Sequence, residues 1–450
     1  MKRFLLVMLT LGLIGAFSTT AFAADVKFSG QFYVAGMYVD QTSLMKDATG
    51  YPSTAFYFQR LRVQTEFIVS PALKLVTRFD AMERAWGAPR AGVTGTPAVW
   101  PSAGATDTDS AGTVAENENI AFDWAYINYK TPIGVFNIGI MNKGTTGTAF
   151  GNNIAPAARI KYAYTYGPVF VEGSISKLDE KSYSAKNTGA TWTDADRDEY
   201  GIEASYSWKG GKAGVNVTYN RDARKRPAPD NYTKVYWQVV PYAMAKIGPV
   251  ALEAELGYVT GKENEYDNGT PDVKMTGLSG YLNALADFGM FYAGGTFAYV
   301  SGDKPDTAKK EGGTLSGGRD WNPCLILFSY YDTYRWVGPI RGHHASSTGD
   351  VNNAMANAFF YQGRVGVRPI ADLNIMASLA YAVADKKPSG YLEKDYGMEF
   401  DLTATYKITN NLSYMLGAGY LWTGDYFKYN NTANKVDDNF MVINKLTLTF

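Results

Sequence analysis

Alternation of apolar and polar side chains is the dominant pattern of this sequence. In its last segment Phe440, Val442 and Leu448 share one parity, while Lys445 and Thr447 take the other. A period of two is the signature of a strand with one apolar and one polar face. The same alternation recurs in four further segments, at 57–67, 119–130, 250–258 and 396–407. The sequence therefore predicts a chain built mainly from β-strands.

The length of these alternating runs separates two kinds of β protein. Most runs last about 10–14 residues, whereas strands of soluble domains average roughly 5–6. Tilted strands that cross a bilayer need about 9–11 residues each. Charged side chains also occupy the polar parity deep inside the runs, as in 250–258, where Glu253 and Glu255 alternate with apolar residues. In a barrel such side chains face a wet lumen, so the pattern favours membrane-spanning strands.

The connections between the runs fall into two kinds that alternate along the chain. Eight are short and rich in turn residues, at 70–72, 131–134, 167–168, 209–212, 248–249, 287–289, 369–371 and 409–411. Nine are longer and polar, at about 40–54, 85–118, 144–156, 178–196, 222–232, 261–271, 303–356, 385–393 and 424–437. This rhythm predicts an all-β protein, a transmembrane antiparallel β-barrel of about 18 strands, with 16 as the second choice. Its short turns would be periplasmic and its long loops extracellular.

The N-terminal segment has the features of an export signal. Lys2 and Arg3 precede the apolar stretch 4–17, and Ala21-Phe22-Ala23 forms a cleavage site of small residues. We therefore expect a cleaved signal peptide at 1–23 and a single barrel domain at 24–450. Two of its loops, 85–118 and 303–356, are unusually long. After residue 24 no stretch reaches the ~18–20 apolar residues of a membrane helix, so a closed barrel is the remaining way to span a membrane.

Composition and charge narrow the function further. Lys plus Arg and Asp plus Glu both number 43, so no bulk charge drives the chain toward nucleic acid. One cysteine excludes an internal disulfide framework, and two histidines disfavour a multi-histidine metal site or a catalytic centre. His343 and His344 are adjacent, so they would point in opposite directions on an extended segment. The acidic run 194–199 lacks the glycine and distal glutamate of a calcium loop. We expect no enzyme activity, no cofactor, no metal site and no nucleic-acid partner.

The export signal, the rhythm of eighteen strands and the alternating segment that ends in Phe450 together resemble Gram-negative outer-membrane porins of the general-diffusion type. Similarity to porins of metal-respiring deltaproteobacteria is weaker. The resemblance implies a water-filled channel in the outer membrane, often a homotrimer, in contact with lipid and lipopolysaccharide. It also implies that the insertion machinery reads Phe450 as an assembly signal. In these porins the third long loop narrows the lumen with a Pro-Glu-Phe-Gly-Gly motif, but loop 144–156 is short and lacks that motif, which leaves the constriction unidentified.

Charged residues on the polar parity are the candidates for lining the pore. They are Arg60, Arg62, Glu66, Arg78, Asp80, Asp123, Arg159, Lys161, Arg364 and Arg368. Two interpretations remain open for them. Basic and acidic side chains on opposing walls would set a transverse field that selects solutes. Alternatively, the same side chains form structural ion pairs within a hydrated wall.

An apolar stretch in the long loop 303–356 is the candidate for a constriction. It contains Trp321, Cys324, Phe328 and Tyr331. Such a stretch would plug the lumen, pack on the barrel or pack on a neighbouring subunit, and an extra strand is a further alternative. Cys324 is best interpreted as a small buried apolar residue.

The sequence therefore predicts a porin for passive diffusion of ions and small hydrophilic solutes. The alternative is a substrate-specific channel, or a barrel scaffold for a secreted or electron-transfer partner.

Overall fold

The computed structural model of the protein describes residues 25–46, 48, 50–87, 121–144, 147–153, 155–181, 195–227, 229–344 and 349–450. The expected signal peptide, 1–23, and most of the expected loop 85–118 lie outside these residues. Among the described residues, no helix is long and apolar enough to cross a membrane.

The described residues form eighteen strands of 10 to 17 residues, which confirms the predicted strand number. In chain order they are β1 (Asp25–Val39), β2 (Thr54–Ser70), β3 (Leu73–Ala85), β4 (Ala121–Thr131), β5 (Gly134–Lys143), β6 (Ala155–Tyr166), β7 (Val169–Asp179), β8 (Arg197–Trp208), β9 (Gly211–Asp222), β10 (Tyr232–Ile247), β11 (Val250–Tyr266), β12 (Val273–Asp287), β13 (Phe291–Val300), β14 (Ala358–Ile370), β15 (Leu373–Ala384), β16 (Asp395–Lys407), β17 (Leu412–Thr423) and β18 (Asn439–Thr449). The described parts of the long loops contain three short helical segments, η2 (Tyr330–Tyr334), α2 (Arg335–Val337) and η4 (Asp425–Lys428).

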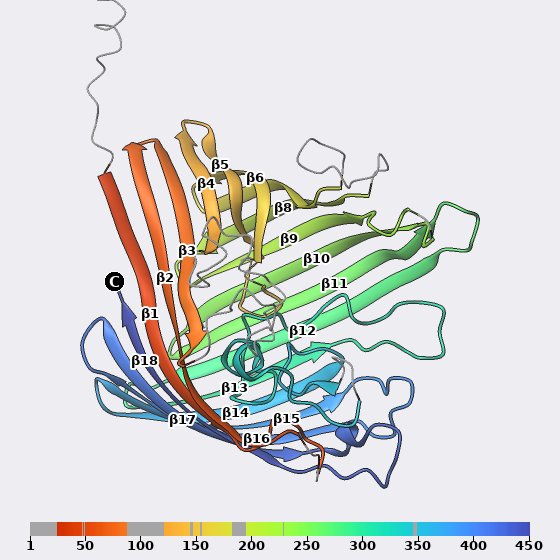
Figure 1. Ribbon diagram of the computed structural model, residues 1–450. Helices are drawn as coiled ribbons and strands as arrows, with labels where there is room; N and C mark the ends of the chain where they lie inside the picture. Colours follow the sequence, from red (N-terminus) through yellow and green to blue (C-terminus); the bar gives the residue numbers. More distant parts are fainter. Residues whose placement is uncertain are drawn as a thin grey trace, which may run out of the picture.

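Every strand pairs antiparallel with its neighbours in the sequence, and the sheet closes on itself (Figure 1). The seam is made by β1 and β18, in register from Gln31 opposite Thr449 to Val39 opposite Met441. Closure leaves no unpaired edge, which is what a sheet in hydrocarbon requires. Short turns gather at one end of the barrel and long loops at the other, as the sequence predicts.

The outer surface carries the apolar parity of most predicted strands. Leu256 on β11, Phe400 on β16 and Leu446 on β18 are exposed on the outside. Their polar neighbours, such as Glu255 and Glu399, are buried within the barrel. The alternation of 250–258, 396–407 and the last segment therefore assigns the two faces correctly.

One segment departs from the predicted alternation. On β4, Arg78 of β3 pairs with Trp124, whereas Phe79 pairs with Phe122, so Asp123 is an extra residue in a β-bulge. Beyond the bulge the parity reverses, and Trp124 and Tyr126 face the lumen instead of the outside. The alternation predicted for 119–130 places Trp124 and Tyr126 on the same parity as Phe122, and this prediction is wrong beyond the bulge, because a bulge shifts the phase of a strand without any signal in its apolar pattern.

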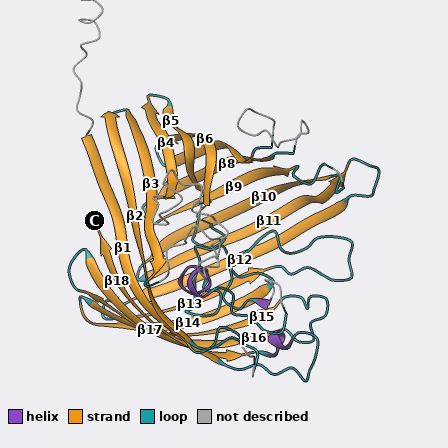
Figure 2. Cartoon of the chain, viewed as in Figure 1, coloured by secondary structure: helices purple, strands orange, loops and turns teal. Residues whose placement is uncertain are grey.

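Among the described residues, two of the long loops enter the barrel. We call the loop between β5 and β6 L3 (144–154) and the loop between β13 and β14 L7 (301–357). Figure 2 shows the short helix of L7 inside the ring of strands. L7 covers an inner wall that is itself apolar, formed by small and medium side chains such as Ala298, Ala380 and Ile443. The interior of the barrel is therefore divided between an apolar core on the side of L7 and a polar wall.

Candidate functional site

The apolar stretch of L7 lies inside the barrel against the wall. Trp321, Cys324 and Phe328 are all less than a tenth exposed, and Tyr331 is half-buried. Trp321 packs edge-on against Phe360 of β14, with ring centroids 5.2 Å apart. The described residues 321–331 form turns and the start of η2, with no strand among them, so an extra strand at this place is excluded.

The short helix of L7 is fixed to the wall near the seam. Trp336 stacks on Phe58 of β2, with ring centroids 3.9 Å apart, and meets Tyr33 of β1 edge-on. On the other side of the seam, Asp332 forms an ion pair with Lys445 of β18 at 3.4 Å. This helix therefore contacts the first and the last strands of the barrel.

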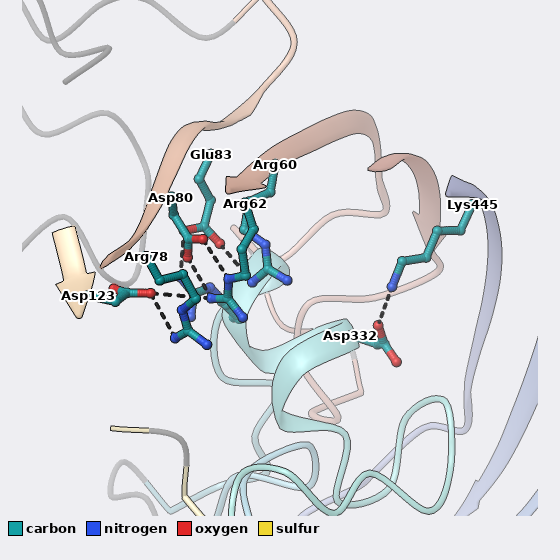
Figure 3. Close-up of polar contacts among 9 residues, drawn as sticks. Arg60, Arg62, Arg78, Asp80, Glu83, Asp123, Asp332 and Lys445 are labelled. Carbon is teal, nitrogen blue, oxygen red and sulfur yellow. Dashed lines mark hydrogen bonds and ion pairs between the residues drawn. The ribbon is translucent and has the colours of Figure 1, made fainter. Parts of the chain in front are cut away.

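A network of alternating charges lies beside this helix on β2, β3 and β4 (Figure 3). Arg62 donates two hydrogen bonds of 2.6 Å to the two carboxylate oxygens of Asp80. Arg78 bonds to Asp123 at 2.9 Å, and its guanidinium lies over the ring of Trp124 at 3.7 Å. The bulge on β4 thus aims the Asp123 carboxylate at the arginines, and it turns Trp124 inward to complete the contact.

The network continues from the wall to L7. Glu83 of β3 forms an ion pair with Arg335 of α2 at 2.7 Å and a longer one with Arg60 at 3.7 Å. The residues of Figure 3, which include Asp332 and Lys445, carry five positive and four negative charges in all. Opposite charges at contact distance largely cancel at longer range, so the network carries a small net positive charge.

The other predicted lining residues lie apart from this network. Glu66 pairs with Lys74, and Lys161 pairs with Glu172, both at 2.9 Å. Arg368 lies at the short-turn end, where it binds Asp287 at 2.9 Å. These side chains are ion-paired with neighbours on the barrel strands.

Two arginines of the inner wall are held by neutral acceptors. Arg159 donates to the hydroxyls of Ser176 and Ser174 at 2.9 and 3.0 Å and to the carbonyl of Asn142. Arg364 donates to the Thr296 hydroxyl at 2.8 Å and to the side chain of Asn283. Within the described part of the chain neither forms an ion pair, so their positive charges are the less compensated ones.

L3 enters the lumen although it is short. The backbone N–H and the hydroxyl of Thr148 donate to the carboxylate of Glu255 on β11, at 3.1 and 2.9 Å. Phe150 stacks on Tyr281 of β12 with ring centroids 5.0 Å apart. The loop therefore reaches from β5 and β6 to β11 and β12. No motif in the sequence predicts this position, and the small residues around Thr148 are the available signal.

The remaining candidates of the sequence have structural partners. His343 lies 3.0 Å from the carbonyl of Lys435, and the ring of His344 packs edge-on against Tyr429, so the two rings face different groups. Asp196 and Asp198 both bind Lys177 at the long-loop end. Asp194 lies outside the described residues.

Solved structures similar to this one place the geometry in a known fold. The outer membrane protein opdK from Pseudomonas aeruginosa aligns with a TM-score of 0.52 and 10% identity, over 94% of this chain and 99% of that chain. OccK11 (OpdR) of Pseudomonas aeruginosa aligns with a TM-score of 0.50 and 12% identity, over 95% of this chain and 96% of that chain. The chain has the fold of an outer-membrane channel. No protein-family model and no curated protein matches its sequence.

The outer-membrane channel fold confirms the expected fold class, a closed antiparallel barrel of eighteen strands. In this fold the outward parity meets lipid and the inward parity lines the lumen. The polar wall of β2 to β12, with L3 and L7 beside it, is therefore the candidate path for solutes. The chemistry available along that path is charge and hydrogen bonding.

Proposed function

We propose that the protein is a channel of the Gram-negative outer membrane through which ions and small hydrophilic solutes diffuse passively. The observation that supports it is the division of the inner wall. L7 covers the apolar part, while charged side chains such as Arg62, Asp123 and Lys161 on the other part remain about a fifth exposed. Such side chains keep water in place along the wall, and diffusion along it needs no cofactor or energy input.

Single-channel recording of the purified barrel in a planar bilayer tests this function. We expect steady conductance steps, and a reversal potential in a salt gradient that reflects the small net positive charge of the network on β2, β3 and β4. Heat-denatured protein from the same preparation is the control. A folded barrel that adds no conductance would contradict the proposal.

A substrate-specific channel is the second candidate, and the packing of L3 against L7 favours it. The ring of Phe150 meets that of Trp321 at 5.2 Å, so the two loops narrow the lumen from two sides. A narrow passage selects solutes by size and by the hydrogen bonds of its walls. The rate at which proteoliposomes swell in a series of neutral sugars of increasing size distinguishes the two candidates. A swelling rate that falls gradually with sugar size indicates a general porin.

The expected partners belong to the same proposal. The exposed apolar outer surface would contact lipid, and the loop end would contact lipopolysaccharide. We also propose a homotrimer and recognition of Phe450 by the insertion machinery. Cross-linking in intact outer membranes tests the trimer, and a monomer band alone would contradict it.

A further inference from the structure

The carboxylate of Glu399 binds the backbone of L7 inside the barrel. The N–H groups of Ile326 and Leu327 donate to its two oxygens, at 2.7 and 2.6 Å. Glu399 is fully buried on the inner face of β16, and both loop residues are fully buried with it. Amides that lack an acceptor in apolar surroundings are costly, and hydrogen bonds to a carboxylate are strong. Glu399 therefore supplies the hydrogen-bond acceptors that the N–H groups of Ile326 and Leu327 need inside the barrel.

The wall around Glu399 is shaped to receive the loop. A side chain at Gly419 on the neighbouring strand would begin 2.7 Å from the carboxylate of Asp401 and 3.2 Å from both Glu399 and Leu325, so any larger residue there would press on these groups. The carboxylates of Glu399 and Asp401 and the thiol of Cys324 lie within 4.8 Å of one another. A metal ion among them would compete with the loop backbone for the oxygens of Glu399, so we assign the group to loop docking.

L3 is held in the same way on another strand. Thr148 donates both its backbone N–H and its hydroxyl to one oxygen of Glu255, which is itself only 6% exposed. Gly147, next to Thr148, has a φ of +74°, and a Cβ there would lie 2.9 Å from that oxygen. The tip of L3 thus approaches the carboxylate as closely as a glycine allows.

The two anchored loops also bind each other. The N–H of Gly151 donates to the carbonyl of Gly317 at 2.8 Å, and the N–H of Asp320 donates to the carbonyl of Asn152 at 3.2 Å. L3 and L7 therefore form one partition in the lumen that is anchored at two wall carboxylates.

We propose that Glu399 and Glu255 are positioning residues of the channel: each carboxylate holds one inward loop against the barrel wall, and together they fix the open cross-section. This inference rests on the proposed channel function and deepens it. The residues act through the loops that they hold, and the open passage widens when a loop leaves its carboxylate.

Cys324 is a built-in reporter of the position of L7. It is the one cysteine of the chain, it lies two residues from Ile326, and it is 6% exposed. Burial also raises the pKa of its thiol, so a water-soluble maleimide reacts with it only when L7 leaves the wall. The rate of alkylation of the folded barrel therefore measures release of L7 and does not require conduction.

Glu399→Met and Glu399→Gln test the role of the carboxylate. The two new side chains have about the same size, but methionine offers no strong acceptor and glutamine offers one. We expect alkylation of Cys324 about 10-fold faster or more in Glu399→Met, with Glu399→Gln between it and the wild type. A purely steric role of residue 399 would give the two variants the same rate.

Glu172→Met is the matched control, because Glu172 is a carboxylate of β7 that pairs with Lys161 of the neighbouring wall strand at 2.9 Å. Cys324 should stay protected in it. All comparisons use barrels that still migrate as folded protein on unheated gels. If Glu399→Met does not fold, Glu399→Gln alone decides.

Conductance completes the test. Glu399→Met and Glu255→Met should each add a larger conductance step, and Glu255→Met reports on L3. If Cys324 in folded Glu399→Met barrels is as protected as in the wild type, and the conductance steps are also unchanged, the assignment of Glu399 is overturned. Unchanged conductance steps in Glu255→Met overturn the assignment of Glu255. A silent wild-type barrel would instead contradict the channel function, while the alkylation rates would still measure loop release.

Discussion

At the scale of single residues, the arginines of the inner wall differ in what compensates them. Two nitrogens of the Arg62 guanidinium donate hydrogen bonds to the carboxylate of Asp80, whereas those of Arg159 donate to two serine hydroxyls and a backbone carbonyl. Partly exposed ion pairs contribute little to stability, about 0–1 kcal/mol each. Their main effect here is on the electric field in the lumen, because each carboxylate cancels much of the charge of its arginine.

Replacement of Arg60, Arg62 and Arg78 together by alanine should shift the channel toward cations. The carboxylates of Asp80 and Asp123 would then lack their partners and face the lumen. We expect the cation-to-anion permeability ratio to rise about 3-fold or more, since the local potential changes by at least the order of kT. The reversal potential in a salt gradient measures this, and an unchanged value would remove the arginines from selectivity.

Asp80→Asn should act in the opposite direction. It leaves the guanidinium of Arg62 without its two charged acceptors while the fold of the hairpin is kept. The same recording should show a shift toward anions that weakens at high salt, where charges are screened. A shift toward cations would contradict the ion-pair geometry.

Trp336→Ala should loosen L7 from the seam. Its ring is buried on Phe58, and such truncations in a core cost about 3–5 kcal/mol. We expect a lower temperature at which the folded band disappears from gels of samples that were heated in steps before loading. Trp86→Ala is the control, since Trp86 is exposed and stacks on the outward ring of Tyr57. Equal effects of both changes would argue against a role in docking.

The residue scale also marks where the sequence is informative. The shared parity of Arg60, Arg62 and Glu66 predicts that they line the lumen, because alternation alone fixes the face of an unbroken strand. Trp124 was assigned to the wrong face, because the bulge at Asp123 reverses the phase. The pairing partners are settled by register between strands, which a single sequence does not contain.

At the scale of elements, L7 explains a pattern that alternation left ambiguous. In β15 the inward positions carry Ala380, Ala382 and Ala384, while Leu379 and Tyr381 face outward. A strand that is apolar on both faces is buried on both faces. The apolar stretch 321–331 and such strands together predict that something fills this part of the lumen, although neither alone says where the loop lies.

Deletion of 321–331 should raise the single-channel conductance roughly two-fold, because the segment covers a large share of the inner wall. A deletion of 305–309, which is an exposed part of the same loop, is the matched control and should leave the step size nearly unchanged. Equal steps in both deletion variants would mean that the apolar stretch does not limit the passage.

L3 was not predictable to the same degree. It is short and lacks the constriction motif of the porins that the chain resembles, which left the constriction unidentified, yet Thr148 reaches Glu255 on the wall of the lumen. The contact depends on the curvature that closes the barrel and brings β5 and β11 within reach of one short loop. Closure is a property of all strands together, and local sequence does not report the distance across the lumen.

At the scale of the whole molecule, the strand number and the division into turns and loops followed directly from the sequence. Period-two runs and turn residues are local signals. A sheet in lipid cannot leave the backbone groups of an edge strand unpaired, so the predicted strands must form a closed barrel. The seam between β1 and β18 is where that solution depends on residues far apart in the chain.

Removal of Phe450 should impair assembly of the barrel. Its backbone exchanges two hydrogen bonds with Gly30, at 2.8 and 3.1 Å, and its ring lies against that glycine. Loss of this residue removes the last contacts of the seam along with the proposed signal. Less folded, heat-modifiable protein in outer-membrane fractions is the expected result, and normal levels would argue against both roles. Phe440→Ala, on the same face of β18, is the control for losing one outward ring.

The position of the L7 helix has a consequence for the order in which the molecule forms. Trp336 contacts β1 and β2, while Thr333 and Asp332 contact Met441 and Lys445 of β18. Its binding surface is complete only after the first and last strands have met. A chain whose sheet is still open therefore carries an uncovered apolar loop, and docking of that loop becomes the step that makes closure difficult to reverse.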